Sequence, residues 1–332
     1  MYNFLPLLKA YKKLDSKALY YVIRVNLNLI YDRMPFKTYT YKTFGASQSV
    51  LADVHYNDNA KANRQAVALT IHAGGFVMGK RDNIAPHWIK ELTNRDFIVV
   101  TIDYRLCPQV SVYDGPIRDT QDAYHWCRDR LPAILIWGHL SMMLGLEEEK
   151  PCAILNGYGP LFLRDPSYRK PAKNIMPMIP EGSLDFDEDL MNKVYDEPVL
   201  TYYNPVVTNA SGKLEIDFSK PRNAWHFGHL SHGTWIKAVG IEGYEDLVDP
   251  ALHLDKDFPP TFFLWGEKDE LVDVRLAHDA YKKLSRCGVD TELTVADGMG
   301  HAFGSSFVEG TEEYEKFVVK PVEFLKKYAD KA

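Results

Sequence analysis

The chain has 332 residues, of which 46% are hydrophobic and 25% are charged, as is typical of a folded globular protein rather than a disordered or fibrous one. Its 39 Lys and Arg residues against 45 Asp and Glu residues give a net charge of -6, and no basic block that would bind nucleic acid or an anionic membrane is present. No apolar run reaches the roughly 18 residues that a membrane span needs, so no membrane association is expected.

Residues 1–40 are predicted to form a helical N-terminal arm, because apolar side chains recur at helical spacing at Leu5, Leu8, Tyr11 and Leu14. Two roles are open for this arm, namely simple packing against the core or a cap over a pocket. The sequence from Met1 lacks the basic region and unbroken apolar run of a signal peptide. The four cysteines are widely separated and form no C-x-x-C pair, which favours reduced thiols and a cytoplasmic location.

Beyond the arm, short apolar runs alternate with amphipathic segments. The predicted strands are residues 66–71, 97–102, 152–155, 261–265 and 291–295. The predicted helices are residues 84–93, 117–130, 274–287 and 314–328. This alternation predicts an α/β fold with a doubly wound, mostly parallel sheet covered on both faces by helices. Residues 1–332 are therefore expected to form a single domain.

Residues 161–235 interrupt the alternation, since they are rich in Pro, Asn, Asp and Tyr and too long for a plain connection. We expect a cap-like insertion over the carboxyl ends of the strands, the edge where ligands bind in open α/β sheets. Its histidines His226, His229 and His232 suggest a metal site. They do not share one helical face, however, and no acid completes a zinc set, so no metal is predicted.

The same histidines have an alternative role as pocket-lining side chains, together with Trp225 and Trp235.

A glycine-rich loop, His72-Ala-Gly-Gly-Phe76, follows the first predicted strand. Glycines permit a close backbone approach, and the N–H groups of Gly74 and Gly75 can point at a developing oxyanion. A plain glycine turn is the alternative. The stretch also matches the G-x-x-x-x-G-K phosphate-binding pattern, with Asp103 as a magnesium ligand at the end of the next strand. Arg81 stands where that pattern requires a Ser or Thr, which disfavours a nucleotide site.

Three further groups follow strand ends. Asp103 and Arg105 are spaced two apart and are interpreted as a structural ion pair. Asp269 lies in a loop after the strand 261–265, and His301 lies in a glycine loop after the strand 291–295. A carboxylate and a histidine in this order place an orienting acid and a general base on one edge of a parallel sheet.

Together these motifs resemble those of the α/β-hydrolase superfamily, in particular its hormone-sensitive-lipase-like esterase branch. The segment 72–76 matches the H-G-G-G-[FW] oxyanion motif, and 103–108 matches D-Y-R-L-x-P. Asp269, in G-x-x-D, and His301 match the acid and base motifs in the family's order, and the resemblance covers about residues 60–330.

The resemblance implies specific roles for these residues. His72 belongs to the oxyanion motif, in which Gly74 and Gly75 supply the N–H groups. His301 is the base and Asp269 orients it, with Asp273 as an alternative acid.

The family's nucleophile is missing, because no G-x-S-x-G, G-x-C-x-G or G-x-D-x-G occurs in the sequence. At the expected place the chain reads Ala-Ile-Leu-Ile-Trp-Gly138, so Ile136 or Leu135 occupies the serine position, depending on which glycine Gly138 represents. The segment 138–145 resembles the helix that follows the nucleophile elbow, the strand-to-helix turn that carries the serine in this family. Divergence of the protein and an error in the gene model are two alternative explanations for the missing elbow.

Two other serines are candidates to replace the missing nucleophile. Ser141 lies on the expected helix and Ser231 lies in the insertion, and both are interpreted as structural. The nucleophile is therefore unknown.

The sequence predicts an esterase-like protein for a small-molecule ester or carbonyl substrate. Without a nucleophile, His301 and Asp269 could act as a non-covalent base in hydrolysis, elimination or cyclisation. The other alternative is a catalytically inactive ligand-binding pseudoenzyme. No cofactor and no nucleic-acid partner are expected, and a homodimer is possible.

Overall fold

The computed structural model describes residues 35–45, 48–57, 65–130, 134–137, 140–172, 186–200, 206–208, 214–305 and 307–332. Most of the predicted helical arm lies outside these residues. Its last part is not helical, because residues 36–40 begin the first strand of the sheet. Within the described ranges, no helix has the length and apolar character needed to cross a lipid bilayer.

The core of the fold is an eight-stranded sheet in the order β1-β2-β4-β3-β5-β6-β9-β10. The strands are β1 (Phe36–Phe44), β2 (Gln48–His55), β3 (Val67–Ile71), β4 (Ile98–Ile102), β5 (Ile134–Trp137), β6 (Ile154–Gly157), β9 (Thr261–Gly266) and β10 (Thr291–Ala296). Strands β1 and β2 form an antiparallel hairpin, and β2 pairs antiparallel with β4. All other neighbours pair in parallel, so the mostly parallel α/β sheet is confirmed.

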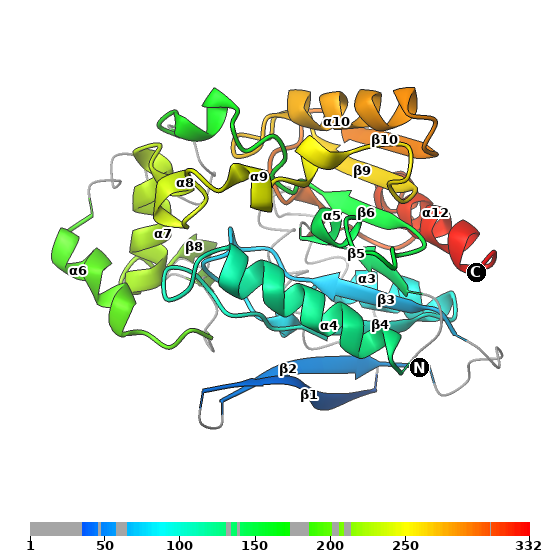
Figure 1. The fold of residues 1–332 in the computed structure, drawn as a ribbon, viewed down its shortest axis with the longest axis horizontal. Helices are drawn as coiled ribbons and strands as arrows, with labels where there is room; N and C mark the ends of the chain where they lie inside the picture. The colour runs from blue at the N-terminus through cyan, green and yellow to red at the C-terminus, as the bar shows by residue number, and fades with distance from the viewer. Residues whose placement is uncertain are drawn as a thin grey trace, which may run out of the picture.

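Helices cover both faces of the sheet (Figure 1). They are α3 (Pro86–Asn94), α4 (Arg118–Arg128), α5 (Ser141–Leu144), α10 (Val274–Arg286), α11 (Glu312–Tyr314) and α12 (Lys320–Ala329). Strand β3 shows why two layers form: Val67, Leu69 and Ile71 join the cluster that holds α4, α5 and α10, whereas Ala68 joins the cluster that holds α3 and α12. Side chains alternate between the faces of a strand, so a strand that is apolar throughout needs cover on both.

The hairpin of β1 and β2 was not among the predicted strands. Most of β1 is exposed, and its sequence alternates aromatic residues with Lys and Thr rather than forming an apolar run. Strand β5 was not among the predicted strands either. The predicted helix 314–328 corresponds to α11, a π-helical turn (Glu315–Val319) and α12 in succession.

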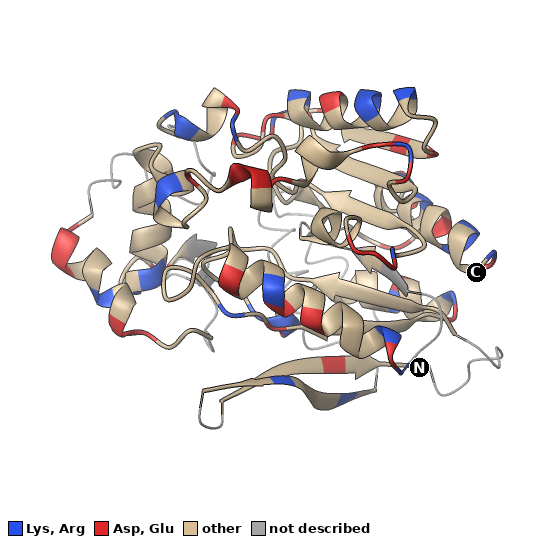
Figure 2. Cartoon of the chain, viewed as in Figure 1, with Lys and Arg blue, Asp and Glu red and all other residues tan. Residues whose placement is uncertain are grey.

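The insertion 161–235 contains short elements that gather at one end of the sheet, on the left in Figure 1. They are a 3-10 helix (Pro166–Arg169), α6 (Glu188–Asn192), a 3-10 helix (Lys193–Asp196), β7 (Val206–Thr208), β8 (Leu214–Ile216), α7 (Pro221–Ser231) and the start of α8 (Trp235–Ala238). Helix α9 (Glu245–Val248) and a 3-10 helix (Pro250–His253) then lead into β9. Acidic and basic residues are interspersed along the outer faces of α4, α10 and α12 (Figure 2).

Candidate active site

His301 and Asp269 lie together beyond the carboxyl ends of β9 and β10. Nδ1 of His301 is 2.9 Å from Oδ2 and 3.0 Å from Oδ1 of Asp269. The Asp269 side chain is fully buried, and the backbone N–H groups of Leu271 and Val272 both donate to its Oδ1, at 3.0 and 2.9 Å. The carboxylate is thereby held in one orientation, and its contact with Nδ1 leaves Nε2 of His301 directed away from it.

Asp273, the alternative acid, has another role. Its Oδ1 accepts a hydrogen bond from the backbone N–H of Arg275 at 2.9 Å and so caps the first turn of α10. Asp269 is therefore the carboxylate that contacts His301.

The loop that carries His301 is hydrogen-bonded to α3. The carbonyl oxygen of Gly304 accepts hydrogen bonds from Nε2 of His87 at 3.1 Å and from Nε1 of Trp88 at 3.3 Å. The ring of Tyr158 packs 5.3 Å from the ring of His301. Burial lowers the pKa of His87 to about 4, so its ring is neutral and donates one hydrogen bond. No sequence pattern singles out His87 or Tyr158, since each lies in an ordinary helix or loop.

His87 is expected to make stability depend on pH. The unfolded chain binds a proton at His87 near pH 6.5 and the folded chain only near pH 4, so protons favour the unfolded state between these values. The free energy of unfolding should therefore fall by about 3 kcal/mol as pH drops from 7 to 4 through this group. Urea unfolding of wild type and His87→Gln at several pH values measures it. Equal pH slopes for the two proteins would contradict the assignment.

The glycine-rich loop after β3 forms a tight turn. Gly74 and Gly75 have φ angles of +125° and +59°, in the left-handed region that favours glycine. The N–H groups of Val77 and Met78 both donate to the carbonyl oxygen of Gly74 at 3.1 Å. A side chain at Gly74 is excluded, because its Cβ would lie 2.1 Å from the carbonyl oxygen of Met78. The turn is thus compatible with the predicted oxyanion loop.

His72 lies buried at the base of this loop. Its ring stacks on Tyr104 with centroids 4.1 Å apart, and its Nδ1 is 2.8 Å from the carbonyl oxygen of Ala73. The Tyr104 hydroxyl donates to the carbonyl oxygen of His72 at 3.1 Å. Burial lowers the pKa of His72, which keeps the ring uncharged. These contacts give His72 a supporting position beneath the loop.

The local structure of this loop disfavours the nucleotide-binding alternative, as the sequence did. Arg81 forms ion pairs with Asp53 at 2.9 Å and with Asp103 at 2.6 Å, and Lys80 pairs with Asp82 at 3.1 Å. Asp103 and Lys80 are therefore both engaged in ion pairs with protein side chains. A single 3-10 turn (Arg81–Asn83) follows the loop, whereas a phosphate loop needs a helix N-terminus there.

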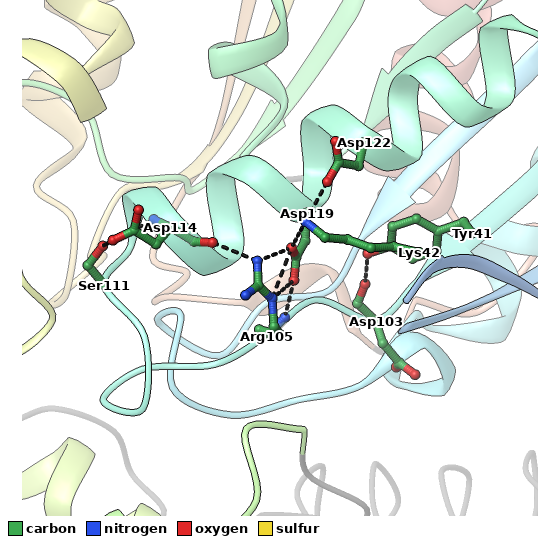
Figure 3. A network of polar contacts seen from close by, with 8 residues as sticks. All are labelled: Tyr41, Lys42, Asp103, Arg105, Ser111, Asp114, Asp119 and Asp122. Carbon is green, nitrogen blue, oxygen red and sulfur yellow. Dashed lines mark hydrogen bonds and ion pairs between the residues drawn. The ribbon is translucent and has the colours of Figure 1, made fainter. Parts of the chain in front are cut away.

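The predicted ion pair between Asp103 and Arg105 is wrong, because Asp103 pairs with Arg81 and Arg105 pairs with Asp119. Arg105 binds Asp119 of α4 through Nε at 2.9 Å and Nη2 at 2.7 Å (Figure 3). Lys42 of β1 reaches the same carboxylate at 2.6 Å, and the Tyr41 hydroxyl donates to the carbonyl oxygen of Asp103 at 2.6 Å. This network joins the β1–β2 hairpin to β4 and α4, next to the glycine-rich loop.

Helix α7 of the insertion lies directly on the glycine-rich loop. A Cβ atom on Gly75 would be 2.3 Å from Cε1 of His226, so these two residues are in contact. One turn earlier, the fully buried Arg222 donates to the carbonyl oxygens of Val77 at 2.9 Å, Cys107 at 2.6 Å and Pro198 at 2.8 Å. A pocket-lining role for His226 was one alternative from the sequence, whereas no sequence pattern indicated Arg222.

The other two cap histidines have separate partners. Nδ1 of His229 is 2.8 Å from Oγ1 of Thr234, and Nδ1 of His232 is 2.8 Å from the carbonyl oxygen of Gly228. Across the described part of the chain, no group of three His, Cys, Asp or Glu side chains is arranged to hold a metal ion.

Comparison with known proteins agrees with the fold of the chain. The BD-FAE family model matches residues 52–156, from β2 to β6. An α/β-hydrolase superfamily protein from Enterococcus faecalis superposes with a TM-score of 0.60 at 14% identity, covering 90% of this chain and 99% of that protein. An esterase from Thermogutta terrifontis, Est2 with bound propionate, superposes with a TM-score of 0.55 at 17% identity, covering 89% and 95%. This chain is an α/β-hydrolase-fold protein.

The chain is also similar in sequence to parts of much longer proteins. The non-reducing polyketide synthase ausA of Emericella nidulans is 28% identical over 332 residues, which cover 84% of this chain and 13% of the synthase. The non-reducing polyketide synthase adrD of Penicillium rubens is 29% identical over 300 residues, covering 76% and 12%. The chain thus spans only about an eighth of the length of these relatives.

In the α/β-hydrolase fold of this chain, β5 leads into the position where the nucleophile is expected. Ile136 of β5 is fully buried, and Leu135 precedes it in the strand. Residues 138–139, which follow β5, lie outside the described residues. Ser141 is fully buried, with Oγ 3.5 Å from the carbonyl oxygen of Leu155.

The second serine that was considered, Ser231, donates from Oγ to the carbonyl oxygen of Gly228 at 2.8 Å. Within the described ranges, no serine is hydrogen-bonded to His301.

Proposed function

We propose that the protein catalyses general-base chemistry at the acyl carbonyl of an ester or thioester. The observation that carries the proposal is the contact between Nδ1 of His301 and the buried carboxylate of Asp269 at 2.9 Å. This pair follows the carboxyl ends of β9 and β10, and the Gly74–Gly75 turn follows the same end of β3. An oriented histidine and a turn with two backbone donors are the groups that acyl transfer requires.

The proposed reaction is hydrolysis without a covalent intermediate. Nε2 of His301 takes a proton from water as the water oxygen bonds to the acyl carbon, and the carbonyl oxygen becomes an oxyanion bound by Gly74 and Gly75. The intermediate then collapses and expels the alcohol or thiol, which receives the proton from His301. Asp269 stabilises the imidazolium throughout. Residual catalysis of about 10³–10⁴-fold over water is known for hydrolase sites that lack a triad member.

The proposed substrate class is an acyl ester or thioester of polyketide type. Two relatives that align with most of this chain are named non-reducing polyketide synthases, and a polyketide acyl chain carries carbonyl groups on alternate carbons. Such a chain also has acidic C–H groups between its carbonyls, so the same base is suited to cyclisation. The four free cysteines, two of them buried, support a reducing, cytosolic setting as part of this proposal.

Fluorophosphonate labelling with peptide mapping tests the non-covalent mechanism. We expect no serine to be labelled under conditions where the protein hydrolyses a simple acyl thioester, because no serine is hydrogen-bonded to His301 in the part of the chain that the structure describes. His301→Ala serves as the control. Labelling of one serine in the wild type that disappears in His301→Ala would contradict the mechanism and identify a nucleophile.

A further inference from the structure

His226 is a buried polar side chain whose ring nitrogens are not used by the described residues. Only 6% of the residue is exposed, and its buried Nδ1 atom has no hydrogen-bond partner in the part of the chain that the structure describes. The structure shows no hydrogen bond at Nε2 either, within the residues it describes. A buried polar group left unpaired costs about 1–3 kcal/mol, so an unpaired imidazole beside a reactive loop indicates a ligand-binding role.

The ring is held against the oxyanion loop. Cε1 of His226 would be only 2.3 Å from a Cβ on Gly75, and Nε2 would be 3.0 Å from it. Arg222, one turn earlier on α7, binds the carbonyl oxygen of Val77 in the same loop at 2.9 Å. This hydrogen bond holds α7 against the loop, so the imidazole lies next to the predicted oxyanion donors Gly74 and Gly75.

His226 is uncharged, because burial and the neighbouring His229 lower its pKa to about 3. A neutral imidazole has one N–H donor and one acceptor nitrogen. With so low a pKa it is a weak base, which favours hydrogen-bond donation over proton abstraction. A carbonyl oxygen is the group that accepts such a hydrogen bond without bringing a charge into the buried site.

We propose that His226 is a specificity-determining residue that donates a hydrogen bond to the second carbonyl oxygen of a 3-oxoacyl group, whose first carbonyl lies at Gly74 and Gly75. This inference rests on the proposed acyl chemistry and names the substrate feature that the site selects. Two donor sets side by side fit two oxygens on alternate carbons of one acyl chain. A simple acyl group has no oxygen to place against the imidazole.

Calorimetric titration with two unreactive amides tests the inference: an N-butyl 3-oxooctanamide and N-butyl octanamide. The wild type is expected to bind the 3-oxo amide about 5- to 10-fold more tightly, the worth of one hydrogen bond. His226→Phe should remove this preference and leave the affinity for octanamide within about twofold. His226→Gln, which keeps an N–H donor, should retain part of it. His229→Phe is the matched control on the same helix and should retain all of it.

Equal binding of the two amides by the wild type, or a preference that survives in His226→Phe, would overturn the inference. If the Phe variant fails to fold, nitrogen-15 NMR of histidine-labelled wild type decides instead. The His226 ring signal, assigned with His226→Gln, should move with the 3-oxo amide and not with octanamide, and equal shifts would count against the inference. The titrations are repeated with His301→Ala. This variant should lose hydrolysis but keep the preference for the 3-oxo amide. Failure of the proposed reaction can therefore be distinguished from failure of this inference.

Discussion

His301→Ala is expected to lower the rate of acyl-thioester hydrolysis by about 10²–10⁴-fold, the usual contribution of a positioned general base. The reason is the geometry of the pair: Nδ1 donates to Asp269 at 2.9 Å, and the alanine variant leaves no group to accept the proton from water. The expected change is in kcat, and the free energy of unfolding is compared alongside it, since the variant also takes the imidazole partner from the fully buried Asp269 carboxylate. Steady-state kinetics with a series of acyl thioesters, together with urea unfolding, measures both.

Two control variants make this result specific. His278→Ala removes a histidine from α10, away from the His301–Asp269 pair, and should leave the rate unchanged. Asp269→Asn should reduce the rate strongly while keeping a similar volume, because the orienting carboxylate is lost. If His301→Ala and Asp269→Asn retain every activity of the wild type, the protein is a ligand-binding member of the fold and the proposed reaction is wrong.

Arg222→Met is expected to lower the free energy of unfolding by about 3–5 kcal/mol, because the variant breaks the ion pair with Glu197 and removes the donor of several carbonyl oxygens. The Arg222 side chain is fully buried, and its Nε donates to Oε2 of Glu197 at 3.0 Å. Its other N–H groups donate hydrogen bonds to the carbonyl oxygens of Val77, Cys107 and Pro198 and to Oε1 of Gln109. These acceptors lose their donor in the methionine variant, which preserves most of the side-chain volume.

Arg164→Met is the matched control for this prediction. Arg164 pairs with Asp246 at 2.8 Å, but both side chains are more than half exposed, so its loss should cost less than about 1 kcal/mol. Urea unfolding followed by circular dichroism compares the two variants. A loss below 1 kcal/mol for Arg222→Met would show that α7 is not anchored through this side chain.

The local sequence pattern predicted the central strands well. The run Ala66-Val-Ala-Leu-Thr-Ile71 is apolar enough to require cover on both faces, and β3 is buried along its whole length. The hairpin of β1 and β2 escaped prediction because β1 is largely exposed and is stabilised by pairing with β2 rather than by burial. The helical arm extended to residue 40 was wrong for residues 36–40 for the same reason.

The candidate site, like the fold, could be predicted only in part from the sequence. Asp269 and His301 could be placed on one edge from sequence, because the carboxyl ends of parallel strands meet there. Their contact at 2.9 Å and the choice of Asp269 over Asp273 depend on how the two loops fold back, which no spacing rule specifies.

The sequence by itself determined the class of fold, the glycine turn after β3 and the order in which Asp269 and His301 follow two strands, since each depends on a short local pattern. Only the tertiary structure decided which buried polar groups support that site. Arg222 reaches Val77 across 145 residues, and His87 reaches Gly304 across 217. Neither residue differs locally from an ordinary helix side chain. Its role comes from burial among partners that are distant in sequence, where a hydrogen bond offsets the cost of burying a polar group.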